Sequence, residues 1–175
     1  EVASIDECYL DYGKVQNLYG DPYEFAKKIQ KEILDTLGFT VNIGIANSKL
    51  CAKMASDFSK PYKIHTLYNH EIQKKMYPLP IDDLFGVGKQ TSQKLHKLGI
   101  HTISDLAHAD ATYLYRYFKN SATKMIEWAQ GIDDSEVVSE QVERKGISQS
   151  TTLPKDMTRT DEIFPILHAI SENVA

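Results

Sequence analysis

The sequence has little cysteine, no long apolar run and no excess of positive charge, and each shortage excludes a class of protein. Its two cysteines, Cys8 and Cys51, lack metal-ligand spacing, so we expect two reduced, buried thiols of a cytoplasmic protein. The apolar runs are too short to span a bilayer, and no membrane partner is expected. The net charge of −4 argues against simple coating of a nucleic acid, although a local basic face can still bind DNA.

What is present is typical of a globular protein. The 175 residues are 42% hydrophobic and 25% charged, enough for one large domain or two small ones. The first residue is Glu1 rather than Met, and residues 2–5 are predicted to form a strand already under way. We therefore expect the chain to be a fragment or a processed piece of a longer protein.

The first part alternates predicted strands and helices. Residues 2–5 and 8–11 are predicted to form a short hairpin, and residues 40–46 and 64–67 two further strands. Asp21 begins a helix as its N-cap, with Glu24 closing a capping box and Gly38 ending the helix. A second helix, capped by Asn47 or Ser48, runs to about residue 59. This alternation predicts an α/β portion, a mixed sheet with helices on one face.

The pattern changes at residues 77–80, which are rich in proline. From there to about residue 138 we find only short helices, with Thr102 and Asp105 forming a capping box and Asp110 and Ser121 as further N-caps. A polar linker follows, then a strand at 148–153 and a helix from about Asp161. We predict an α/β domain at 1–77, a small all-α domain at 78–138, and a truncated start of an α+β domain at 139–175.

Adjacent carboxylates occupy the turn between the first two predicted strands, in Ser4-Ile5-Asp6-Glu7. Neighbouring strand residues face opposite ways, so a turn or bulge is needed to bring both carboxylates to one ion. Hard oxygen ligands of this kind suit Mg²⁺. An isolated Asp-Glu pair is more often a solvated acidic turn, so the pair alone decides nothing.

Three lysines accompany the second helix. At about 100° per residue, Lys49, Lys53 and Lys60 project within roughly 40° of one another. A cationic stripe beside a metal site fits a triphosphate or a DNA backbone. The alternative is an ordinary solvated face.

The most specific pattern is a glycine hairpin between two helices of the all-α domain. A short helix is predicted to end at Phe85, and a second helix to run from the hairpin to Leu98. The glycines let the backbone approach a phosphate, and the amides that open the second helix can then meet it. The hairpin and the two lysines that assist it are Gly86, Val87, Gly88, Lys89 and Lys94. This pattern resembles the helix-hairpin-helix motif, which binds DNA without regard to base sequence. The alternative is a purely structural helical turn.

Together and in this order, the three patterns resemble the Y-family translesion DNA polymerases of the bacterial DinB/UmuC type. The matching stretches are residues 4–10, 42–61, 79–106 and 144–152. The resemblance implies a palm at 1–77, a thumb at 78–138, and the start of a little finger at 139–175. It implies DNA-directed DNA polymerisation across damaged bases, with primer–template DNA and deoxynucleoside triphosphates as substrates and a sliding clamp as partner.

The resemblance also implies residue roles. Asp6 corresponds to a ligand of both catalytic Mg²⁺ ions and Glu7 to a ligand of the ion that activates the primer 3′-hydroxyl. Lys60 corresponds to a contact with the triphosphate, and Lys49 and Lys53 to other basic positions near the DNA. Arg144 and Lys145, before the last predicted strand, are candidates for template contact.

Two departures from the family pattern bear on these expectations. Family palms usually continue Lys-Pro with a glycine-containing turn, whereas Pro61 is followed here by Tyr62-Lys63. The family's other metal-binding Asp, its steric-gate aromatic and its fingers precede the Asp6 position and are not in this chain, so we expect the fragment alone not to polymerise. Two other hypotheses remain open: a non-catalytic DNA-binding module that uses only the hairpin, and a nuclease that uses the acids for hydrolysis.

Overall fold

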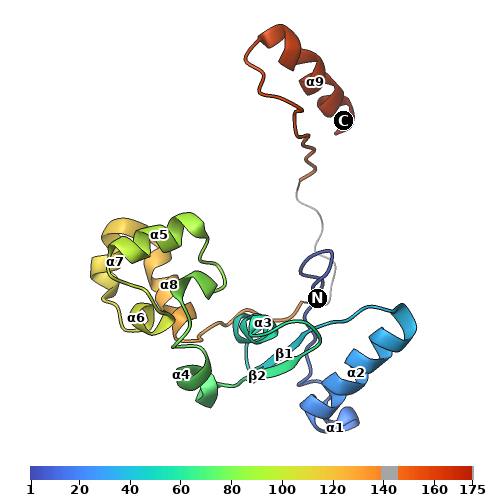
Figure 1. Cartoon of the computed structure of the whole chain (residues 1–175), viewed down its shortest axis with the longest axis vertical. Coiled ribbons are helices and arrows are strands. Elements are labelled where there is room, and N and C mark those ends of the chain that lie inside the picture. Colours follow the sequence, from blue (N-terminus) through green and yellow to red (C-terminus); the bar gives the residue numbers. More distant parts are fainter. Residues whose placement is uncertain (139–145, 175) are drawn as a thin grey trace. The chain divides into compact units, whose positions relative to one another are not determined.

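The structure, a computed structural model, describes residues 1–138 and 146–174. Residues 1–138 form one compact unit and residues 139–175 belong to another (Figure 1), so each is described by itself.

The first elements form an α/β portion, which we define as α1 to β2. Its helices are α1 (Gln16–Tyr19), α2 (Pro22–Leu37) and α3 (Lys49–Asp57), and its strands are β1 (Ile43–Ala46) and β2 (Ile64–Leu67). The strands pair in parallel, with Ile43 opposite Ile64 and Ala46 opposite Leu67. A parallel pair needs a crossover, and α3 supplies it. An isolated antiparallel bridge joins Val2 to Cys8.

Helix α2 begins and ends where the sequence predicts. The Asp21 carboxylate accepts hydrogen bonds from the amides of Tyr23 (3.0 Å) and Glu24 (2.9 Å), and Gly38 closes the helix with φ of 76°. The predicted capping box is incomplete, because the Glu24 side chain accepts from Lys27 at 2.7 Å instead of turning back to Asp21. The nearby ammonium group offers this carboxylate a charge-assisted bond.

Other predicted boundaries move inward. The first two predicted strands shrink to the single Val2–Cys8 bridge, because the amides of Ala3 and Ser4 both donate to the Glu7 carbonyl and curl the chain into a turn. Cys8 is exposed rather than buried, whereas Cys51 is buried as expected, and both are free thiols. Helix α3 ends at Asp57 rather than at residue 59, since the residue before Pro61 is disfavoured from helical backbone.

The second half of the unit is a helical portion, which we define as η2 to α8. After η1 (Asn69–Glu71) and α4 (Ile72–Lys75), it contains η2 (Ile81–Asp83), α5 (Lys89–Lys97), α6 (Ile103–Ala107), α7 (Ala111–Phe118) and α8 (Ser121–Ala129). The predicted order of an α/β part followed by an all-α part is confirmed.

The helix caps in this portion are mostly as predicted. Thr102 and Asp105 form a complete capping box, and the Asp110 side chain accepts from the Tyr113 amide at 2.8 Å. The prediction of Ser121 as an N-cap is wrong: Ser121 is the first residue of α8, and Asn120 precedes it without a side-chain cap. The helix entry already has helical backbone at Asn120, which leaves its side chain out of reach of the first-turn amides.

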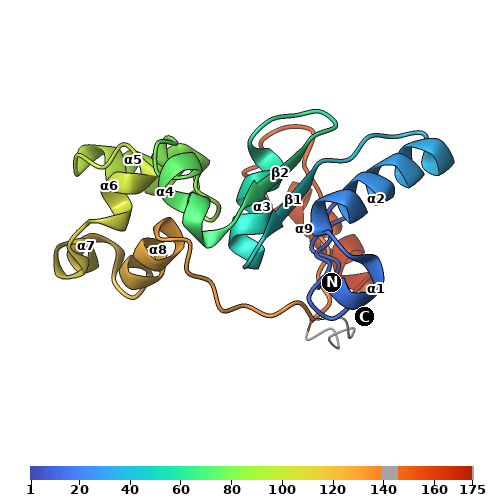
Figure 2. The ribbon, with the colours of Figure 1, turned by 90° about the horizontal axis from the view of Figure 1, so that it is seen from below.

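One buried cluster joins the two portions. It contains Cys51, Met54 and Ala55 of α3 and Leu67 of β2, together with Leu84, Leu95, Leu106, Leu114 and Ala129 of the helical portion. Because this apolar core is continuous, helix α3 is buried against both portions, and Figure 2 shows it beside the strands on the side that leads to α4 and the helical portion.

In the second unit, α9 spans Thr160–Glu172 and agrees with the predicted helix. The strand predicted at 148–153 is not formed. A strand needs a hydrogen-bonded neighbour, and α9 is the one regular element in 146–174.

The contact of β1 with α3 depends on Gly44. A Cβ atom at this position would lie 1.9 Å from the Ala52 carbonyl oxygen and 2.6 Å from the Ser56 amide nitrogen, both of which are backbone atoms of α3. Backbone cannot move aside as a flexible side chain can, so the strand and helix must separate to admit a methyl group.

We predict that Gly44→Ala lowers the free energy of unfolding by about 3 kcal/mol or more, because it forces β1 away from α3. Urea denaturation of the purified chain measures this loss. Gly13→Ala is the matched control, since its Cβ would meet only the Asp11 carboxylate, at an ordinary 3.4 Å. Equal losses for the two variants would contradict the close packing described here.

Glu71 ties the end of β2 to the helices that follow. Its carboxylate accepts from Lys75 (2.6 Å), from the Tyr68 amide (2.8 Å) and from the Thr66 hydroxyl (3.0 Å). Burial on its own would raise the pKa of Glu71, but these hydrogen bonds outweigh it and lower the pKa from 4.5 to about 2. The ionised form therefore stabilises the fold.

This stabilisation is expected to be present above pH 4.5 and to be lost as the pH falls toward about 2, because the folded pKa lies below the unfolded one. We predict that Glu71→Gln costs about 1–3 kcal/mol of unfolding free energy at pH 7, and that the difference from wild type shrinks through this window. Urea titrations at several pH values measure it. Glu32→Gln, at an exposed position on α2, is the control, and a pH-independent cost for Glu71→Gln would contradict the assignment.

Candidate functional site

The predicted metal ligands lie on an exposed turn. The Ser4 hydroxyl donates to the Asp6 carboxylate at 2.7 Å, and the amides of Ala3 and Ser4 donate to the Glu7 carbonyl at 2.9 and 3.1 Å. The chain therefore bends at residues 4–7, with the Asp6 carboxylate held by Ser4. We call residues 4–7 the acidic turn.

The acidic turn lies against helix α3. The Lys53 ammonium is 2.6 Å from the Glu7 carboxylate and 3.0 Å from Asp57, and the Lys49 ammonium is 2.6 Å from Glu1. The side chains of Lys49 and Lys53 are only 17% and 16% exposed. Lys49 and Lys53 are therefore paired with acids rather than open to solvent, and Lys53 contacts the acidic turn directly.

Lys60 occupies a different setting from the other two lysines. It lies beyond the end of α3, so the helical spacing that grouped it with Lys49 and Lys53 does not apply. Its ammonium is 2.6 Å from Asp57 and its side chain is 59% exposed. Partial burial would raise the pKa of Asp57, but hydrogen bonds from Lys60 and Lys53 lower it below the usual range. Asp57 thus links Lys60 to Lys53.

The turn after Lys60 lacks the expected glycine, and a tyrosine adopts the strained backbone conformation instead. Tyr62 has φ of 57°, in the left-handed region that glycine adopts at little cost. The Asn42 side chain accepts from the Lys63 amide at 2.9 Å just after it, which helps to hold the turn at the start of the sheet.

The glycine hairpin connects η2 to α5. Gly86 has φ of 86°, and a Cβ there would lie 2.4 Å from Cζ3 of Trp128 on α8. Gly88 is the N-cap of α5 and offers no side chain to its first-turn amides. Lys89 and Lys94 are exposed on α5, whereas Val87 is buried. The hairpin therefore presents backbone amides and lysines outward from a base that rests on Trp128.

Helix α3 lies between the hairpin and the acidic turn. The Phe85 amide, next to the hairpin, donates to the sulfur of Met54 at 3.3 Å, while Lys53 one residue earlier on α3 pairs with Glu7. One helix thus carries both the predicted metal-binding turn and the predicted DNA-binding hairpin. Arg144 and Lys145 lie outside the described residues.

Sequence reasoning missed several residues around this site. Asp57 and Asp133 carry no motif. Asp57 pairs with Lys53 and Lys60 at local spacing, whereas Asp133 reaches α3 from a distant part of the chain. A chain of hydrogen bonds in the helical portion was missed too: Asp82 to His96 at 2.8 Å, and His96 to His101 at 2.9 Å. The bond with His96 lowers the pKa of Asp82 and ties η2 to α5 across the hairpin.

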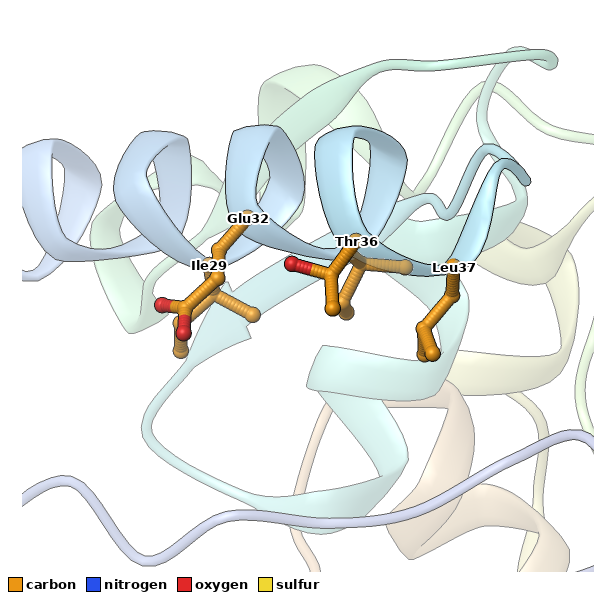
Figure 3. A pocket seen from close by; sticks show the side chains of 5 residues that line it. Ile29, Glu32, Thr36 and Leu37 are labelled. Atoms are coloured by element: carbon orange, nitrogen blue, oxygen red, sulfur yellow. The ribbon is translucent and has the colours of Figure 1, made fainter.

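A shallow hollow on α2 has a different character. Figure 3 shows Ile29, Glu32, Thr36 and Leu37 along one side of the helix, and Ile33 completes the lining. Its chemistry is apolar apart from Glu32 and Thr36, and it contains none of the predicted site residues.

Within residues 1–138 and 146–174, no group of three or more His, Cys, Asp or Glu side chains gathers closely enough to hold a metal ion. The two carboxylates of the acidic turn are hard oxygen donors that fit part of a Mg²⁺ site. No helix in the described part of the chain is both long and apolar enough to cross a bilayer.

Known proteins match this chain along nearly its whole length. A model of the impB/mucB/samB family matches residues 1–57, and a model of the IMS family HHH motif matches residues 69–100. DNA polymerase IV of Clostridium acetobutylicum is 46% identical over 99% of the chain. A Y-family DNA polymerase chimera of Dbh and Dpo4 superposes with a TM-score of 0.81 at 32% identity over 99% of the chain.

The chain belongs to the Y-family of DNA polymerases. It spans 44% of the Clostridium relative and 51% of the chimera, that is, about half of each. DinB from Sulfolobus solfataricus matches with a TM-score of 0.68 at 33% identity, over 78% of this chain and 40% of that one.

Each of the two family models covers a different part of the candidate site. The acidic turn with Lys49 and Lys53 lies in the first matched segment, and the hairpin with Lys89 and Lys94 in the second. Lys60 falls between them. The resemblance predicted from three motifs is thereby confirmed at the level of the family.

We predict that Gly86→Ala lowers the free energy of unfolding by about 1–3 kcal/mol, because alanine is strained at this positive φ and its methyl group meets Trp128. Trp128 is the chain's single tryptophan, so its fluorescence follows unfolding in urea directly. Gly88→Ala is the matched control: its Cβ would meet no heavy atom within 4 Å and its φ is −78°. A stable Gly86→Ala protein would contradict the described base of the hairpin.

Proposed function

We propose that this chain is part of the catalytic core of a damage-bypassing, DNA-directed DNA polymerase, with a palm at 1–77, a thumb at 78–138 and the start of a little finger at 139–175. Its substrates are primer–template DNA and deoxynucleoside triphosphates, and a sliding clamp recruits the full-length protein. The observation that carries the proposal is that α3 bears the acidic turn on one side and the glycine hairpin on another, in a chain of this family.

In this proposal Asp6 and Glu7 hold Mg²⁺. Their carboxylate oxygens have the required chemistry, and the exposed turn leaves room for phosphate and water oxygens, which Mg²⁺ retains in nucleotide sites. When bound, two such ions supply electrostatic stabilisation to the attacking and leaving oxygens of nucleotidyl transfer. The Ser4 hydroxyl fixes the Asp6 carboxylate, and Lys53 fixes that of Glu7.

The lysines contribute according to their exposure. Lys60 is 59% exposed and pairs with Asp57 at the surface, so its flexible ammonium can turn toward the triphosphate of an incoming nucleotide. Lys49 and Lys53 are held by carboxylates and act by placing positive charge behind the acidic turn.

The hairpin binds the backbone of the duplex. Amides at the start of α5 and the positive end of the helix dipole face a phosphate, and Gly88 leaves space for it because no side chain stands there. Lys89 and Lys94 add two exposed charges on the same helix. Contacts of this kind hold DNA irrespective of its sequence.

The proposal predicts that Asp6→Ala in the full-length protein lowers nucleotide insertion by on the order of 10³-fold or more and leaves primer–template binding intact, because the hairpin is unchanged. Single-turnover primer extension and fluorescence anisotropy measure the two properties. Asp11→Ala, which removes a surface carboxylate paired with Lys14, is the control.

Persistent insertion by the Asp6→Ala protein would contradict the proposal and favour a DNA-binding module without a catalytic turn. A nuclease would instead release nucleotides from DNA with Mg²⁺ and no added triphosphate, and would lose that release in the same variant.

A further inference from the structure

Residues 131–138 form a connection that returns from the helical portion to the α/β portion. We call this segment the strap. It leaves the end of α8 and runs toward the N-terminus, which Figure 2 shows as the orange coil that emerges from α8. Its start is anchored in the helical portion, where the Gln130 side chain donates to the Ala107 carbonyl at 2.9 Å.

The strap first touches α3 through close packing. Gly131 has φ of 76°, and a Cβ there would lie 2.4 Å from Cδ1 of Ile72 and 3.3 Å from the sulfur of Cys51. The Cys51 thiol donates to the Gly131 carbonyl at 3.6 Å. The chain therefore turns sharply where it meets the first turn of α3, and the glycine permits both the turn and the contact.

Asp133 then caps α3 from outside the helix. Its Oδ2 accepts from the Leu50 amide at 3.1 Å, while the local cap, Ser48, accepts from the Cys51 amide at 3.3 Å. Ser135 holds the Asp133 carboxylate in place, with its hydroxyl at 2.8 Å and its amide at 3.3 Å. The first-turn amides of α3 are thus shared between a residue of the α/β portion and a residue of the strap.

The far part of the strap is tied to Glu1 and to Lys49 of α3. Lys49 donates to the Glu136 carbonyl at 3.3 Å, and the Val138 amide donates to the Glu1 carboxylate at 2.7 Å. The same Glu1 carboxylate pairs with Lys49 at 2.6 Å. Hydrogen bonds from Lys49 and Val138 lower the pKa of Glu1, so the carboxylate is ionised near neutral pH and both ties are charge-assisted.

These contacts form a closed path. Helix α3 contacts the acidic turn through Lys53 and the residue before the hairpin through Met54. The strap leads from the end of α8 back to the first turn of the same helix, where Asp133 binds the Leu50 amide. We propose that Asp133 is a positioning residue, which holds the hairpin at a fixed place relative to Asp6 and Glu7 by capping α3 from the strap. The positioning role in catalysis rests on the function proposed above, whereas the mechanical role does not.

The mechanical role is tested in the 175-residue chain without any enzymatic assay. Spin labels at Lys28→Cys on α2 and Lys97→Cys on α5, both exposed positions, report the distance between the two portions once exposed Cys8 is replaced by Ser. Pulsed dipolar spectroscopy is expected to show one narrow distribution for the parent chain and a distribution about twice as broad for Asp133→Ala, because α3 then loses its link to the strap.

Three further variants separate the strap from ordinary helix capping. Asp134→Ala removes the same charge from the adjacent exposed residue, and Ser48→Ala removes the local cap of α3 without cutting the strap; both are expected to keep the narrow distribution. Asp133→Asn retains an oxygen acceptor for the Leu50 amide and is therefore also expected to give the narrow distance distribution. Equal broadening in Asp133→Ala and Ser48→Ala would overturn the proposal, as would no broadening in Asp133→Ala.

If Asp133→Ala does not fold, as circular dichroism would show, Glu1→Ala replaces it. This variant frees the far part of the strap at Val138 and leaves both caps of α3 in place, so it too is expected to broaden the distribution. A narrow distribution in Glu1→Ala would then overturn the proposal.

The catalytic consequence is measured in the full-length protein. Asp133→Ala is expected to lower the insertion rate at saturating primer–template by about 10-fold to 100-fold, since small misplacements are costly to group transfer, while DNA affinity changes little because the hairpin is intact. Asp133→Asn is expected to recover the rate. Lost DNA affinity with an unchanged rate at saturation would overturn the positioning role. A wild-type protein without insertion activity would contradict the proposed function and leave the spectroscopic result standing.

Discussion

The burial of helix α3 is the constraint on which the rest of the first unit depends. Its apolar residues Cys51, Met54 and Ala55 belong to a core shared by the α/β portion and the helical portion, so each portion buries apolar surface against this helix. Gly44 brings β1 so close to this helix that a single methyl group between them has no room. A nine-residue helix is only marginally stable alone, and here tertiary packing and caps at its N-terminus keep it formed.

The polar faces of α3 are organised around this burial. Lys49 and Lys53 cannot enter the core and instead pair with Glu1 and Glu7, which keeps the acidic turn against the helix. In a chain of net charge −4, positive charge is thus concentrated where carboxylates must be held together. The positive charges beside the proposed metal site are thus fixed by the packing of α3. Lys49 also donates to the Glu136 carbonyl of the strap.

Local backbone strain lies close to the same features. Tyr62 takes a left-handed conformation, which is costly for a residue other than glycine, and the Asn42 side chain accepts from the amide of Lys63 next to it. Gly86 and Gly131 also have positive φ, and each brings the backbone against a large side chain, Trp128 and Ile72. The hairpin and the strap thus begin at points where only glycine permits the required contact.

The sequence alone determined what local chemistry encodes. The caps at Asp21, Asp110 and Thr102, the glycine stop at Gly38, the strand at 64–67 and the family itself were all predicted, because each depends on residues close together in the chain or on the order of motifs. Other predictions failed: the strands at 2–5 and 8–11 are replaced by a turn with one bridge, the strand at 148–153 is not formed, Cys8 is exposed, and α3 ends before it reaches Lys60.

Only the tertiary structure decided which charges meet. The pairing of Lys53 with Glu7 joins residues 46 positions apart, and the bond from Leu50 to Asp133 joins residues 83 apart. Neither pairing leaves a periodic or spaced pattern, because an ion pair or a cap needs only one suitable group brought near by the packing of α3. The sequence supplied the residues of the proposed site, and the burial of one helix determined how they are held.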